Sequence, residues 1–124
     1  MAHLNLEDIL NAKDTDEKKI FVPEWGDEES FVIVRSMTAE ARDAYEQSLF
    51  STNSEGDFER NLDNARAKLV SACVIGPDGS RMFKTEAHVK ALGSKSAAVV
   101  DRLFAACQRI NAISEKDVEE LAGN

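Results

Sequence analysis

The residue types most often used in catalysis and metal binding are few and scattered in this chain. The two histidines, His3 and His88, lie far apart, and neither has a cysteine or carboxylate at the spacing of a zinc site. The two cysteines, Cys73 and Cys107, fall within helical apolar patterns, which favours small buried residues over a disulfide or a reactive thiol. No serine stands in a Gly-x-Ser-x-Gly elbow. We therefore expect no catalytic residues, no metal and no cofactor, and a protein that is not an enzyme.

Two short motifs match ligand-binding loops only in part. Gly93-Ser94-Lys95-Ser96 is similar to the end of a phosphate-binding loop, but Val89 and Ser94 occupy the places where that loop needs glycine. Asp78-Gly79 lacks the run of oxygen ligands that a calcium loop requires. Within Gly76-Pro77-Asp78-Gly79, proline fixes φ and glycine permits a positive φ, so this segment predicts a tight turn.

The net charge of -8 on 124 residues is unevenly distributed. Residues 1–30 hold nine acidic and three basic side chains, whereas residues 31–114 hold ten acidic and eleven basic ones. Acidic ends on a near-neutral body disfavour non-specific contact with nucleic acid or anionic lipid. The longest apolar runs are far shorter than the roughly 20 residues of a membrane span, and the N-terminus does not follow the pattern of a secretory signal. We expect a soluble cytoplasmic protein without nucleic-acid or membrane partners.

The chain divides into an arm and one domain. Residues 1–18 are polar and acidic apart from a short patch at Leu4, Leu6, Ile9 and Leu10, which predicts a loose or partner-dependent arm with one or two helical turns. Residues 19–124 have the length and composition of a single domain with its own core.

A β-hairpin is predicted at the start of that domain. The ranges 19–23 and 31–35 are rich in β-branched and aromatic residues, and the polar segment 26–29 between them has the composition of a loop. The continuous apolar run Phe31 to Val34 predicts a strand that helices cover on both faces. A third short strand at 81–83 can be added to this hairpin.

The rest of the domain has helical periodicity. Thr38 is a candidate N-cap for one helix, Asp57 for a second, and Thr85 for a brief helix at 86–92 that Gly93 would end in a left-handed conformation. The second helix would place its apolar residues on one face: Phe58, Leu62, Ala65, Leu69 and Ala72. Ser94 or Ser96 caps a last long helix, and Ser114 begins a final turn or two. The predicted fold is α+β, a mainly helical single domain with an N-terminal hairpin packed against helices.

Several side chains are candidates for partner binding. The last long helix has two apolar stripes, which include Val99 and Leu103, so it is either central to the domain or shares a face with another chain. Trp25 lies in a polar turn and is either folded back on the hairpin or an interface anchor. The weaker candidates are Arg35, Tyr45 and Arg102. We expect weak homo-oligomers.

Residues 86–102 also have the spacing of a helix-turn-helix. Affinity for DNA depends mainly on neutralising phosphates, however, and the would-be reading helix offers Lys95 and Arg102 offset by Asp101. A DNA-binding regulator is therefore an alternative from a different functional class, and packing of two helices is the simpler interpretation.

The order of several fragments resembles that of the tail assembly chaperones of phages with long, non-contractile tails. The resemblance covers roughly residues 19–121. It rests on Pro23-Glu24-Trp25-Gly26, the strand that ends at Arg35, the segment 65–74 followed by Asp78-Gly79, and the segment 92–97.

The resemblance implies a non-enzymatic function. Proteins of this family bind the tape measure protein, a long helical rod, keep it soluble and help the tail tube assemble around it. Many also exist in a longer, frameshifted form that recruits the tail tube protein. They act in the cytoplasm of the infected bacterial host and are not expected in the finished virion. An unrelated protein-interaction adaptor would satisfy the same composition.

Overall fold

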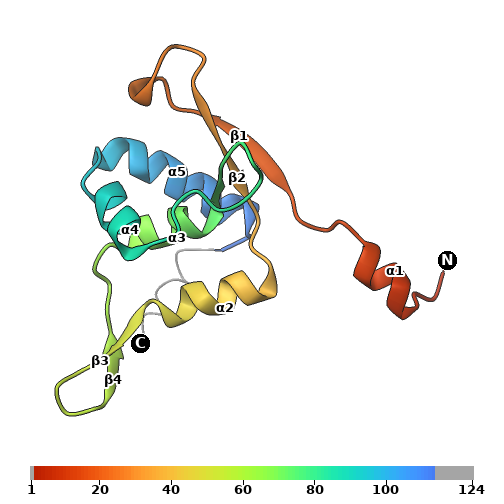
Figure 1. The fold of residues 1–124 in the computed structure, drawn as a ribbon, viewed down its shortest axis with the longest axis horizontal. Helices are drawn as coiled ribbons and strands as arrows, with labels where there is room; N and C mark the ends of the chain where they lie inside the picture. Colours follow the sequence, from red (N-terminus) through yellow and green to blue (C-terminus); the bar gives the residue numbers. More distant parts are fainter. Residues whose placement is uncertain (1, 114–124) are drawn as a thin grey trace.

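The computed structural model describes residues 2–113, which form a body of helices beside a small antiparallel sheet (Figure 1). Its elements are α1 (Leu6–Asn11), β1 (Glu17–Phe21), a 3₁₀ turn (Pro23–Trp25), β2 (Phe31–Arg35), α2 (Ala39–Gln47), β3 (Phe50–Thr52), β4 (Phe58–Arg60), α3 (Ala65–Cys73), β5 (Val74–Ile75), α4 (Glu86–Gly93) and α5 (Ala97–Ile110). The predicted α+β class with an N-terminal hairpin is confirmed. The turn expected after Ser114 lies outside the described residues.

The hairpin of β1 and β2 forms a three-stranded sheet in the order β1-β2-β5. Ile20 lies opposite Val32, and Phe21 opposite Phe31. Because side chains alternate along a strand, Ile20, Val32 and Val34 face the helices while Phe21 and Phe31 share the other face. The expectation that helices cover both faces is wrong: Val34 is fully buried, but Phe31 is 46% exposed.

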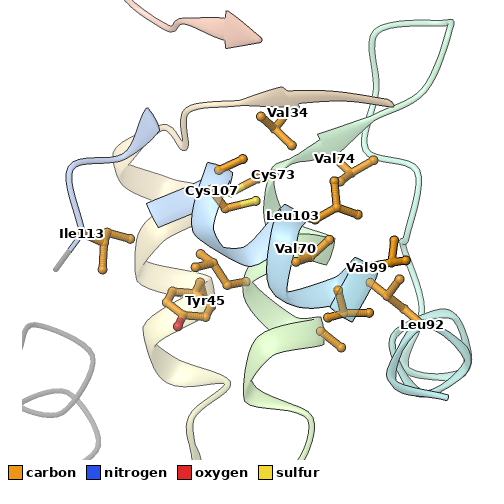
Figure 2. Close-up of a cluster of buried hydrophobic side chains, with 14 of the residues drawn as sticks. Val34, Tyr45, Val70, Cys73, Val74, Leu92, Val99, Leu103, Cys107 and Ile113 are labelled. Carbon is orange, nitrogen blue, oxygen red and sulfur yellow. The ribbon is translucent and has the colours of Figure 1, made fainter. Parts of the chain in front are cut away.

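The core lies between the inner face of this sheet and the helices α2, α3 and α5. Helix α5 is central, since it packs against α3, β2 and β1. Figure 2 shows side chains from all these layers pointing toward one another, including Val34, Val70 and Leu103. Most of the wide apolar surface of α5 is therefore covered by the chain's own elements, since Val99, Leu103, Ala106 and Cys107 are buried. Within residues 2–113, every helix is too short or too polar to cross a bilayer.

Two helices begin at the N-cap residues predicted from the sequence. The Thr38 hydroxyl accepts a hydrogen bond from the Ala41 amide at the start of α2, and the Thr85 hydroxyl accepts one from the His88 amide at the start of α4. Each satisfies an amide that has no partner within the helix.

Gly93 does not have the predicted left-handed conformation. It is the last residue of α4, and the αR residue Ser94 forms the C-cap. A Cβ at this position would lie 2.5 Å from Asn64 Oδ1, at the start of α3. The glycine therefore permits close approach of α4 to α3 rather than a left-handed end.

The helix predicted from Asp57 onward is wrong in its first half. Residues 50–60 instead form the β3–β4 hairpin, and α3 begins only at Ala65. The Asn53 side chain accepts from the amides of Glu55 and Asp57, and Gly56 has a φ of 85°, so local turn chemistry folds the chain back here. Phe58 is consequently 82% exposed instead of lying on a core face.

The possible third strand at 81–83 is reduced to a single bridge between Arg81 and Ile75. Val74 and Ile75 supply the third strand instead, directly after α3. The predicted tight turn separates the two segments, and Gly79 has the expected positive φ, 83°.

Candidate partner-binding surface

Three exposed aromatic side chains lie at the loop end of the β1–β2 hairpin, and we call Phe21, Trp25 and Phe31 the aromatic surface. Their exposed fractions are 55%, 38% and 46%. Phe21 and Phe31 meet edge to face, with ring centroids 6.4 Å apart. Lys19 lies on the same face, with its Nζ 4.2 Å from the Phe31 centroid. Aromatic residues are enriched at protein–protein interfaces, so these rings are a candidate protein-binding surface.

A bridge to α5 fixes the loop that carries Trp25. The guanidinium of Arg102 donates from Nη1 to Glu24 Oε1 at 2.9 Å and from Nη2 to Glu24 Oε2, and Nη1 also donates to the Phe21 carbonyl at 3.3 Å. The Arg102 hydrogen bonds lower the pKa of Glu24 to about 2 and raise the pKa of Arg102. The structure thus brings Trp25 and Arg102, both singled out from the sequence, to the same end of the hairpin.

Arg35 lies at the opposite end of β2 from Phe31. Its Nη1 donates to the Gly79 carbonyl at 3.0 Å, which ties the strand to the tight turn after β5. Arg35 is therefore not part of the aromatic surface, and its observed contact is with the chain's own backbone.

The remaining three candidates are core residues in this structure. Tyr45, Val99 and Leu103 are only 4%, 3% and 1% exposed, and all belong to the buried cluster in Figure 2. Burial raises the pKa of Tyr45 to about 12. These side chains offer almost no surface to a partner of the folded chain.

Sequence reasoning did not select Phe21 and Phe31. The available signal was the alternation of side chains along a strand. Lys19 and Phe21 alternate with Ile20 and Val22, so the two pairs point to opposite faces of the strand. A hairpin register that opposes Phe21 with Phe31 then places both rings on one face. That register depends on the structure of residues 22–30, which the sequence pattern did not define.

Both cysteines pack in the core of the protein. Both thiols are buried, and Cys73 Sγ accepts a hydrogen bond from Asn111 Nδ2 at 3.3 Å. The hydrogen bond from the Cys107 thiol to Cys73, together with burial, raises the pKa of Cys107, which disfavours the reactive thiolate. Among residues 2–113, no group of three or more His, Cys, Asp or Glu side chains is arranged to hold a metal ion.

The comparison with known proteins gives a structural match. No family model matches the chain, and no curated protein is found to be similar. The solved structure of the bacteriophage HK97 tail assembly chaperone superposes with a TM-score of 0.55, covering 89% of this chain and 96% of that one at 20% sequence identity. This chain has the fold of a phage tail assembly chaperone. The resemblance inferred from the sequence is thus confirmed for the fold.

Helix α5 is a core helix that buries Val99, Val100 and Leu103, whereas α4 buries only Leu92. The exposed charged side chains near the start of α5 are engaged within the chain, Asp101 by Arg66 and Arg102 by Glu24. Duplex binding needs cations that are free to neutralise phosphates. The observed arrangement therefore argues against the DNA-binding alternative.

Proposed function

We propose that this chain is a non-enzymatic phage tail assembly chaperone that binds the tape measure protein and keeps it soluble while the tail tube assembles. The observation that carries the proposal is the fold shared with the HK97 protein along 89% of the chain. The site of action is the cytoplasm of the infected host, and the chaperone leaves before the virion is finished.

The aromatic surface is the proposed contact with the rod. A chaperone must cover apolar helical surface temporarily, which requires moderate contacts and no chemistry. Trp25 is the expected anchor, because large aromatic side chains contribute most of the binding energy in many interfaces. The Glu24–Arg102 bridge holds the Trp25 loop in place before binding, which reduces the entropy lost on association.

Two further partners belong to this proposal. The tail tube protein would be recruited mainly through a longer, frameshifted form of the chain, and copies of the chaperone associate weakly with one another. Several copies are needed per tape measure protein, because a helical rod rises about 1.5 Å per residue and one small domain covers only a short length of it.

Co-expression with the tape measure protein of the same phage tests the proposal. We expect a soluble complex with several copies of this chain per rod. Trp25→Ala should weaken the complex by about 2 kcal/mol, roughly thirtyfold in Kd. Phe58→Ala is the matched control, since Phe58 is also an exposed aromatic but lies on the separate β3–β4 hairpin.

A rod that stays insoluble beside a folded chain would refute the chaperone function and favour a general interaction adaptor. Equal loss of binding in the Trp25 and Phe58 variants would refute the assignment of the aromatic surface.

A further inference from the structure

The N-terminal arm carries a preformed helix whose apolar side chains are exposed. Leu6, Ile9 and Leu10 of α1 have helical spacing that places them on one side, and they are 69%, 57% and 71% exposed. A complete capping box starts this helix: Asn5 Oδ1 accepts from the Asp8 amide at 2.9 Å, and Asp8 Oδ2 accepts from the Asn5 amide at 3.0 Å. Figure 1 shows α1 standing apart from the body.

The body carries an apolar groove between α3 and the N-terminal half of α5. It has a volume of about 550 Å³. Leu62, Ala65, Ala97, Val100 and Phe104 supply its apolar lining. Arg66, Lys95 and Asp101 form its charged rim, where Arg66 Nε lies 2.9 Å from Asp101 Oδ1. Leu62 is 50% exposed, so the lining is open to an incoming side chain.

We propose that α1 of one copy docks in the α3–α5 groove of a second copy. The helix presents a small apolar face of leucine and isoleucine, and the groove presents an apolar lining of similar character. Their charges are also complementary. Residues 2–16 hold four carboxylates and one lysine, whereas the groove rim holds two cations and one carboxylate. Docking would therefore bury apolar surface from both sides and reduce repulsion between acidic arms.

The position of the arm favours a second copy over the chain's own groove. The arm, expected from the sequence at residues 1–18, joins the body at Glu17, because β1 already begins there. Glu17 lies beside Arg109 and Ile110 at the C-terminal end of α5. The groove lies along Ala97 to Phe104, toward the other end of that helix. An arm directed away from its own groove leaves each copy with one donor and one acceptor, so copies associate either head to tail or as a dimer that exchanges both arms. The inference extends the proposed self-association and requires no tape measure protein.

Sedimentation of the full chain alone, from micromolar to millimolar concentration, tests this docking. We expect Leu10→Asp in the arm and Leu62→Asp in the groove each to weaken self-association at least roughly tenfold. Both positions are exposed, so the domain should remain folded. Phe58→Asp is the control, because it makes the same charge change at an exposed apolar side chain away from both surfaces and should associate like the wild type.

Mixing the two variants gives the sharper result. The Leu10→Asp copy keeps its groove and the Leu62→Asp copy keeps its arm, so an equal mixture should form dimers and nothing larger. Wild-type-like association of the Leu10→Asp variant would overturn the proposal. A wild type that is monomeric at every concentration would also overturn it, whether its groove holds its own arm or accepts only a tape measure helix.

Trp25→Ala separates this inference from the tape measure proposal. It should leave self-association unchanged while weakening binding to the rod. Loss of self-association in the Trp25 variant but not in the Leu10 variant would assign the contact to the aromatic surface and refute docking of the arm.

Discussion

The bridge between Glu24 and Arg102, beside the aromatic surface, can be measured through the pKa of the Glu24 carboxyl group. Arg102→Gln should raise the pKa of Glu24 from about 2 toward its ordinary value of 4.5, because the two guanidinium hydrogen bonds favour the charged carboxylate. Since the folded-state pKa lies below the unfolded one, the bridge stabilises the fold above about pH 4.5. That contribution is lost as the pH falls toward 2. NMR titration of the Glu24 carboxyl carbon measures the shift.

Arg66→Gln is the matched control for this titration, because it removes an arginine from another exposed ion pair, that with Asp101. An equal rise of the Glu24 pKa in both variants would indicate a general effect of net charge and would contradict a specific bridge from Arg102.

The burial of Tyr45 predicts a second pH dependence of stability, at alkaline pH. Its hydroxyl is buried with no hydrogen-bond partner among the described residues, and burial raises its pKa to about 12. Unfolding exposes a phenol that ionises near pH 10, so the folded state should lose stability as the pH rises from about 10 to about 12. The chain has a single tyrosine, so its absorbance change reports this group alone.

Tyr45→Phe should remove the Tyr45 part of this alkaline loss and leave the part that comes from Cys107, whose pKa is also raised. At neutral pH it should change stability by less than about 1 kcal/mol, since the hydroxyl has no described protein partner. The hydroxyls of Tyr45 and Ser71 belong to residues that line a cavity of about 230 Å³, which has room for water. Ionisation of Tyr45 at its ordinary pKa in the folded protein would contradict the observed burial.

Among the elements, those defined by neighbouring residues were predictable from the sequence. Thr38 and Thr85 cap helices through amides three residues away, and Gly79 permits a turn within its own four residues. The helix assigned from Asp57 failed because helical periodicity competed with the turn that Asn53 and Gly56 form. Periodicity identifies apolar positions but does not decide which local conformation wins.

The candidate site was less predictable because surface and core are distinguished only by tertiary packing. The apolar stripes of α5 are equally compatible with an interface and with a core, and the structure buries Val99 and Leu103. Phe31 is instead exposed, because helices cover only one face of the apolar strand β2. Trp25 was identified because an aromatic side chain in a polar loop is unusual locally. Arg102 was only a weaker candidate, because its bond to Glu24 joins residues far apart in the sequence.

A pair of substitutions tests the placement of the second helix. Phe58→Ser should change stability by less than about 0.5 kcal/mol, because Phe58 is exposed on β4. Leu69→Ala should cost about 2–5 kcal/mol, because Leu69 is fully buried in α3. Chemical denaturation of both variants measures the difference. A loss of more than about 2 kcal/mol in the free energy of unfolding for Phe58→Ser would show that Phe58 is buried, as in the continuous helix predicted from periodicity.

At the scale of the whole molecule, charge and architecture together determine which partners fit. The acidic arm lies apart from a near-neutral body that exposes an aromatic surface and an apolar groove. These are the two surfaces proposed to bind protein helices. A net charge of -8 limits such contacts to specific surfaces, because it opposes non-specific association between copies.

The same charge predicts that the chain does not bind DNA. Duplex binding requires several cations that replace counterions at the phosphates, and Arg102 of α5 is already engaged by Glu24. Mobility-shift experiments at low ionic strength should show no retardation of duplex DNA at micromolar protein. Micromolar binding that weakens steeply with added salt, and that falls in Lys95→Gln but not in Lys13→Gln, would contradict this expectation. It would place the reading surface at the start of α5, where Lys95 precedes the helix, and so favour the DNA-binding regulator over the chaperone.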